Sequence, residues 1–377
     1  MNEFPIILEN QGIPLFYPYI PKKAKKEVLN TLSSRWIGQG PKVEKFEKKF
    51  EKKFFKNHKT IAVGAGTDAL HLAYLLANIK KNDEVIVPGF TCTATNIPLL
   101  YIGAKPVFAD VEINTLNISI EDIKKKISKK TKAIVCVDYG GIPNDYIELN
   151  KICKKNNLIL ISDAAHSLGS KFIGKYSCQY ADFVIFSFQA IKTLTTGDGG
   201  MLAIKNKKLY HKAKRLRWFG IDRSAKQKGI WENDIKEIGY KYQMNDIAAS
   251  IGLAALEEID NVIKYRNKLF TLYERYLKNK NIRIIGKAST NKYYNSSWLI
   301  TVVVNKNRVG LMKKLRKHKV ESAQVHYRND RYSVFSNKKL NLKNMNYIEN
   351  KYLVLPLHMK VKEMDVKNIC NIINDGW

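Results

Sequence analysis

The chain has 377 residues, and its 65 Lys and Arg against 34 Asp and Glu give a formal net charge of +31. A surplus of this size makes nucleic acid the first partner to consider, because phosphate backbones bind dense basic surfaces. The composition is 45% hydrophobic and 11% aromatic, which excludes a disordered basic tail. At this length we expect one large domain that carries a smaller one.

The basic residues are mostly lysines, since only eleven of the 65 are Arg. They occur in pairs such as Lys22-Lys23 and Lys52-Lys53, within segments that have an amphipathic helical pattern. This favours a solvated Lys-rich surface over a nucleic-acid footprint, which should cluster on one face and contain more Arg. No helix-turn-helix or finger pattern is evident. A basic DNA-binding regulator therefore remains only as the non-enzyme alternative, and no nucleic-acid partner is expected.

The five cysteines form no C-x-x-C pair and are odd in number, which predicts reduced thiols and a cytoplasmic protein. The first residues show neither a basic start nor a long apolar run, and no stretch of about 18 uninterrupted apolar residues occurs. We expect no export signal and no membrane association.

Short β-rich runs alternate with helical patterns from about residue 60 onward. The helical pattern at 67–79 is apolar on most of its surface, which predicts a largely buried helix. The predicted strands are 61–63, 84–88, 105–111, 133–139, 158–165, 181–188 and 199–204. Most of these runs are continuously apolar, as is typical of strands covered on both faces. The sequence thus predicts an α/β domain with a mostly parallel sheet.

After about residue 205 the chain becomes richer in long helical stretches. These comprise a helix over 245–277, strands near 297–304 and 352–357, and a helix near 308–318. The pattern predicts a large domain over residues 1–250 and a small C-terminal α/β domain over residues 251–377.

Three sites in the large domain carry chemistry. The first is the strand-to-helix turn around Gly66, Thr67 and Asp68, whose backbone N–H groups suit a phosphate. A purely steric use of glycine is equally compatible with this turn. The second is Asp163, at the carboxyl end of an apolar strand where ligands of open α/β sheets collect. It could pair with a protonated ring nitrogen or, alternatively, begin a helix.

The third site is Lys192, which lies in an apolar and hydroxyl-rich turn ahead of a glycine-rich bend. Burial there would lower the pKa of its amine and make it a nucleophile for a Schiff base, whereas a lone lysine on a surface would be solvated. A phosphate site, an acid and an amine together indicate pyridoxal 5'-phosphate as the cofactor. No metal site is predicted.

The set resembles the DegT-type (DegT/DnrJ/StrS) pyridoxal-phosphate-dependent sugar aminotransferases, from about residue 12 to the C-terminus. Supporting segments include AVGAGTDALHLAY at 62–74, SDAAHSLGS at 162–170, SFQAIKTLTTGDGGML at 187–202 and GYKYQMNDIAASIGLAALEEID at 239–260. They occur in the family's order and spacing. The resemblance implies the type I pyridoxal-phosphate aminotransferase fold, with a mostly parallel mixed sheet between helices and a smaller C-terminal domain.

The resemblance also implies a role for each matching residue. Lys192 would bind the cofactor covalently and move the proton during transamination. The remaining cofactor contacts would be Gly66, Thr67, Asp68 and Ser187 at the phosphate, Asp163 at the ring nitrogen, His166 near the 3-hydroxyl, and Ala165 under one ring face. Lys192 also argues against the family's dehydratase branch, which has His at this position.

Two positions depart from the family pattern. Cys92 stands where an aromatic residue commonly covers the second ring face, so either Cys92 or Phe90 takes that role here. Lys241 stands where the family has an Asn that reaches the phosphate of the neighbouring subunit. It would make a charge-assisted contact there, or it faces solvent.

The resemblance implies transfer of an amino group from L-glutamate to a nucleotide-linked keto sugar, most often a 4-keto-6-deoxy hexose, for amino sugars of a surface polysaccharide or glycan. A 3-keto sugar nucleotide or a keto-octulosonate would use the same core residues. Candidate substrate contacts are His326, Tyr327, Arg328 and Arg331, although the arginines could instead pack on the domain surface. A site residue from a neighbouring subunit implies a homodimer with composite active sites.

Overall fold

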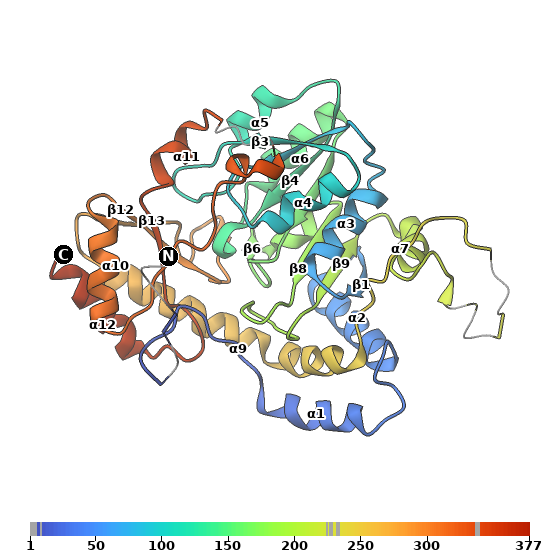
Figure 1. Cartoon of the computed structure of the whole chain (residues 1–377), viewed down its shortest axis with the longest axis horizontal. Coiled ribbons are helices and arrows are strands. Elements are labelled where there is room, and N and C mark those ends of the chain that lie inside the picture. The colour runs from blue at the N-terminus through green and yellow to red at the C-terminus, as the bar shows by residue number, and fades with distance from the viewer. Residues whose placement is uncertain (1–5, 8–9, 224, 226–228, 231–233, 336–339) are drawn as a thin grey trace.

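A seven-stranded sheet forms the centre of the large domain (Figure 1). The computed structural model describes residues 6–7, 10–223, 225, 229–230, 234–335 and 340–377. The strands run in the order β1-β9-β8-β5-β4-β2-β3, and all neighbours are parallel except β9, which is antiparallel to β1 and β8. They are β1 (Lys59–Val63), β2 (Glu84–Pro88), β3 (Lys105–Ala109), β4 (Thr131–Val137), β5 (Ile159–Asp163), β8 (Phe183–Ser187) and β9 (Gly200–Ile204).

Helices cover both faces of this sheet (Figure 1). Ile134 and Cys136 of β4 pack into one core, whereas Ala133 and Val135 pack into the other. The first core contains side chains from α2 (Pro41–Phe54), α5 (Ile120–Lys126), α6 (Tyr146–Asn156) and the first half of α9 (Asp246–Tyr276). The second contains side chains from α3 (Gly66–Leu76), α4 (Thr93–Tyr101) and α7 (Tyr210–Leu216). The expectation of strands buried on both sides is confirmed.

The small domain is built on a three-stranded antiparallel sheet in the order β10-β12-β13. Its elements are β10 (Ile282–Ile284), β12 (Ile300–Val304), α10 (Arg308–Lys317), α11 (Lys343–Ile348), β13 (Tyr352–Leu355) and α12 (Glu363–Asn374). A third sheet, β11-β6-β7, consists of the two-residue strands β6 (Lys171–Phe172), β7 (Lys175–Tyr176) and β11 (Tyr293–Tyr294), and α1 (Lys22–Leu32) lies along α9. The type I aminotransferase architecture predicted by the resemblance is therefore present.

Helix α9 joins the two domains, because its first half packs in the sheet core and its second half in the small-domain core. The boundary expected at residue 250 falls within this uninterrupted helix. The buried carboxylate of Asp246 accepts hydrogen bonds from the backbone N–H groups of Gly40, Lys42 and Val43, at 2.8, 3.0 and 3.0 Å. The start of α9 thus supplies the N-terminal cap that α2 lacks among its own side chains.

Several predicted strands end earlier than their apolar runs. The run at 105–111 ends as a strand at Ala109 because the carboxylate of Asp110 accepts from the backbone N–H groups of Asn344 and Met345, at 2.8 and 3.0 Å. Asp110 thereby caps α11 of the small domain. Among the described residues, no helix has the length and apolar character required to cross a membrane.

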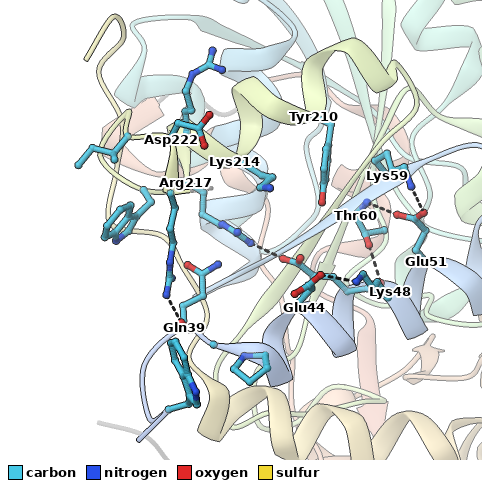
Figure 2. Close-up of a pocket in the computed structure, with 18 residues that line it drawn as sticks. Gln39, Glu44, Lys48, Glu51, Lys59, Thr60, Tyr210, Lys214, Arg217 and Asp222 are labelled. Atoms are coloured by element: carbon cyan, nitrogen blue, oxygen red, sulfur yellow. Dashed lines mark hydrogen bonds and ion pairs between the residues drawn. The ribbon is translucent and has the colours of Figure 1, made fainter. Parts of the chain in front are cut away.

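The free edge of β1 is covered by charged side chains that line a cavity of about 470 Å³ between α2 and α7 (Figure 2). The N–H groups of Thr60 and Ala62 donate to Glu51 and Glu47, at 3.2 and 2.7 Å. Arg217 pairs with Glu47 at 2.6 Å and donates to the carbonyl of Ala62 at 2.9 Å. These side chains bind the backbone groups at an edge that would otherwise pair with another strand. The charged lining of this cavity is therefore explained by protection of the edge of β1.

We predict that Arg217→Met lowers the free energy of unfolding by about 3 kcal/mol, because the buried Glu47 would lose its counter-charge. Urea denaturation followed by circular dichroism measures the change. Lys23→Gln removes an exposed ion pair with Glu257 and should leave the midpoint unchanged. Equal midpoints for both variants would show that the Arg217 pair does not stabilise the edge.

Candidate active site

A cavity of about 420 Å³ lies at the carboxyl ends of the parallel strands. Asp163 is the last residue of β5, Ser187 is the last residue of β8, and Gly66 follows β1 at the start of α3. The predicted site residues that line it are Gly66, Thr67, Cys92, Asp163, Ala165, His166, Ser187, Lys192 and His326. The fold therefore brings together residues from segments that are far apart in the sequence.

The N-terminus of α3 forms one end of the cavity. No side chain caps this helix, so its first N–H groups and the positive end of its dipole are available to an anion. A Cβ atom on Gly66 would lie 2.9 Å from the Cβ of Ser187, and only glycine permits this close approach. The side chain of Asp68 does not line the cavity; burial raises its pKa to about 6, against hydrogen bonds from the N–H groups of Ala65 and Gly64.

Asp163 places a buried carboxylate against the cavity. Its oxygens accept hydrogen bonds from the hydroxyl of Thr95 at 2.8 Å and from the N–H of Ala165 at 3.1 Å. Burial raises the pKa of Asp163, while these hydrogen bonds and the charge of Lys192 lower it. A turn rather than a helix follows β5, so Asp163 is not a helix cap and its charge faces a site that suits a cation.

Lys192 lies in the turn after β8, which is closed by a hydrogen bond from the Lys192 N–H to the carbonyl of Gln189 at 2.9 Å. Burial lowers the pKa of its amine to about 8, against the raising effect of Cys92 and Asp163. The amine lies 3.7 Å from the ring centroid of Trp298. A lysine of this kind carries a substantial fraction of neutral amine near physiological pH and is a competent nucleophile.

His166 and His326 stack in parallel, with their ring centroids 5.2 Å apart and an interplanar angle of 4°. Burial lowers the pKa of His166 well below its usual value and that of His326 to about 3, so both rings are neutral. The N–H of Gly140 donates to Nδ1 of His166 at 3.5 Å, which leaves the ring proton on Nε2. Nε2 of His326 is buried without a hydrogen-bond partner, and it belongs to a residue of the cavity wall.

The alternative between Cys92 and Phe90 is decided by their positions. Cys92 is exposed at the cavity wall. Phe90 is buried and packs against Tyr139 and Tyr352, with centroid distances of 5.2 and 5.0 Å. Cys92 is therefore the residue available to a ligand.

Arg328, expected either to face a diphosphate or to pack on the domain surface, is engaged largely inside the protein. The residue is 3% exposed, and its guanidinium binds both carboxylate oxygens of Asp330, at 2.8 and 2.6 Å. It also contacts Asn346, Glu349 and the carbonyl of Leu340. Its donors are engaged internally, so Arg328 fixes the loop, and it also lines the neighbouring cavity described next.

Tyr327 and Arg331 remain available, and both line a neighbouring cavity of about 460 Å³. Arg331 is exposed, and its guanidinium lies 3.6 Å from Glu349. His326, predicted as a substrate contact, lies in the wall of the cofactor-sized cavity instead. Lys241 is exposed, does not line the cavity of its own chain, and lies 5.4 Å from the ring of Phe219; its contact with a neighbouring subunit stays a prediction.

Sequence reasoning missed two residues of the site, Thr95 and Trp298. Thr95 lies three residues after Cys92, and its hydroxyl donates to the carboxylate of Asp163. Trp298 begins an apolar run whose pattern predicts only a strand. The one feature of the sequence that could have indicated a role for Trp298 is the rarity of tryptophan, since the chain contains five.

Comparisons with known proteins agree with this geometry. The family model described as "DegT/DnrJ/EryC1/StrS aminotransferase family" matches residues 18–374. GDP-perosamine synthase of Escherichia coli O157:H7 is 36% identical over 84% of this chain and 85% of that protein. GDP-perosamine synthase of Vibrio cholerae is 31% identical over 96% and 98%, respectively. The solved sugar aminotransferase CalS13 of Micromonospora echinospora has a TM-score of 0.90 and 26% identity, covering 97% of this chain and 100% of its own.

The residues present fit pyridoxal phosphate. The narrow turn at Gly66 offers backbone donors to a phosphate, the buried carboxylate of Asp163 suits a protonated ring nitrogen, and Lys192 supplies the amine. The unpartnered Nε2 of His326 leaves one more polar group for a bound molecule.

We predict that Gly66→Ala weakens binding of pyridoxal phosphate about tenfold or more, because the added Cβ would push Ser187 away from the turn. Equilibrium titration by absorbance measures the affinity. Gly38→Ala is the matched control, since a Cβ there meets no atom within 4 Å. Unchanged affinity in Gly66→Ala would argue against phosphate binding at this turn.

The pH dependence of covalent cofactor loading follows from the amine of Lys192. Its neutral fraction increases about tenfold per pH unit below the pKa of about 8 and levels off above it. We expect the loading rate of the cofactor-free protein, followed by stopped-flow absorbance, to rise between pH 6 and 8 and then to reach a plateau. A rate that continues to rise to pH 10 would place the pKa at its ordinary value.

Proposed function

Because the chain belongs to the DegT/DnrJ/EryC1/StrS aminotransferase family, and is thus a pyridoxal-phosphate-dependent sugar aminotransferase of amino-sugar biosynthesis, we propose that it moves the amino group of L-glutamate to a nucleotide-linked 4-keto-6-deoxy hexose. The observation that carries the chemistry is the pairing of a neutralisable buried amine, Lys192, with a buried carboxylate, Asp163, in one cavity. We place the product in the assembly of a surface polysaccharide or glycan.

When bound, pyridoxal phosphate supplies an aldehyde that carries the amino group and a ring that accepts electrons from the substrate carbon. Asp163 holds positive charge on the ring nitrogen through its carboxylate. Ser187 and the N–H groups of Gly66 and Thr67 bind the phosphate. His166 donates its Nε2 proton to an oxygen at the ring edge.

Lys192 moves the proton. Its neutral amine removes a proton from the α-carbon of the amino donor, and the resulting ammonium returns a proton to the carbon of the keto acceptor. A pKa of about 8 suits both directions, because neither form of the amine is scarce near that pH. The neutral rings of His166 and His326 add no positive charge beside the amine.

In this proposal, the acceptor enters from the side of Cys92, next to the loop that carries Tyr327 and Arg331. Tyr332 lines the neighbouring cavity together with Tyr327 and Arg331. The exposed guanidinium of Arg331 is suited to a diphosphate. Two relatives that bear the name GDP-perosamine synthase support a nucleotide-linked acceptor.

A homodimer with composite sites completes this proposal. Lys241 is exposed and does not line the cavity of its own chain, which leaves its ammonium available to the phosphate site of a second copy. The formal net charge of the chain, +31, would also attract an anionic sugar nucleotide.

The two half-reactions test this proposal separately. The loaded protein should lose its yellow absorbance on addition of L-glutamate and recover it with a nucleotide-linked 4-keto-6-deoxy hexose, whereas Lys192→Ala should support neither change at a measurable rate. Lys351→Ala is the matched control and should retain both, because this half-buried lysine lies over Tyr347 and does not line the cavity.

The acceptor panel includes a 3-keto sugar nucleotide and a keto-octulosonate. Recovery with one of these alone would move the substrate assignment within the same chemistry. Full turnover by Lys192→Ala would contradict the proposed role of this lysine.

A further inference from the structure

Trp298 contacts the reactive lysine from the other domain. It lies two residues before β12, is 1% exposed, and lines the cavity. Its ring face lies 3.7 Å from the amine of Lys192, and its indole N–H donates to the carbonyl of Ile191 at 2.9 Å. One side chain of the small domain therefore touches both the amine of Lys192 and the backbone that carries it.

Hydrogen bonds and ring contacts hold Trp298 in place. The backbone N–H of Trp298 donates to the carbonyl of Gly140 at 3.0 Å, and the backbone carbonyl of Trp298 accepts from Arg266 at 3.3 Å. His166 stacks on the ring with a centroid distance of 3.9 Å, and Phe16 with one of 5.9 Å. A ring fixed by packing and hydrogen bonds has few alternative positions, so it can define where the amine lies.

The amine of Lys192 lies against the ring of Trp298, while Cys92 and Asp163 act on it through their charge. Among the described residues, Lys192 forms no ion pair, and the carboxylate of Asp163 is engaged by Thr95 and Ala165. The titratable groups that share the cavity with Lys192 are Cys92, Asp163, His166, Asp198 and His326. An ammonium close to an indole face in a desolvated site is stabilised by the ring quadrupole.

We infer that Trp298 is a positioning residue for transamination: its π face holds the free amino group of Lys192 at the cavity, and its N–H fixes the turn through Ile191. The lysine would then return to one place whenever its amine is free. The small domain would in this way help to define the geometry of proton transfer in the large domain. This inference rests on the proposed role of Lys192 as the proton carrier.

Fluorinated tryptophan tests the π contact without changing the shape or the N–H donor of the ring. The full-length chain, freed of cofactor, would be prepared with ordinary, 4-fluoro- and difluorotryptophan. Acetylation of Lys192 by acetic anhydride would be measured by peptide mass spectrometry between pH 6 and 10. Because fluorine weakens the quadrupole and so destabilises the ammonium, the inflection near pH 8 should fall stepwise, by about 0.3 to 1 pH unit.

Two controls separate this effect from general ones. Lys351 lies 3.6 Å from the ring of Tyr347, which is not labelled, so its rate of acetylation should be the same in all three samples. Trp36→Leu removes a 40% exposed indole outside the cavity and should leave the Lys192 inflection unchanged.

Substitution of Trp298 gives a second, independent comparison. Trp298→Phe keeps an aromatic face and should hold the inflection within a few tenths of a pH unit, but loses the N–H donor and should slow covalent cofactor loading several-fold. Trp298→Leu loses both contacts and should also lower the inflection. The same inflection with ordinary and fluorinated tryptophan would overturn the inference, whether or not the Leu variant folds. No substrate is present, so failure here is distinct from failure of the proposed sugar acceptor.

Discussion

The main constraint on this structure is a parallel sheet that is covered by helices on both faces. A polar side chain without a partner is unfavourable in its interior, because desolvation is costly there. Polar groups from distant parts of the chain therefore gather where the strands end. Asp163 and Ser187 close β5 and β8, and the turn at Gly66 follows β1. The location of the site is thus a consequence of how the sheet is buried.

Burial also sets the chemistry of the site. It lowers the pKa of Lys192 and raises that of Asp163, since each charged form loses water. The same effect keeps His166 and His326 neutral. The cavity consequently combines an amine that can lose its proton with a buried carboxyl group that gains a counter-charge when a cationic ring binds.

Three of the positively charged residues have a structural role inside the protein. Arg217, Arg266 and Arg328 are buried and bind carboxylates or carbonyl groups inside the protein. They fix the edge of β1, the approach of Trp298 and the loop after His326, rather than presenting a surface to nucleic acid. The family membership likewise gives no support to a DNA-binding regulator.

The sequence by itself determined the strands, the long helix, the family and the core of the site, because continuous apolar runs and the spacing around Gly66, Asp163 and Lys192 are local properties of the chain. It could not decide between Cys92 and Phe90, nor detect that Arg328 is used internally. Those outcomes depend on which residues of separate segments meet. The contact of Trp298 with Lys192 joins residues more than a hundred positions apart, and only the packing of the small domain against the large one creates it.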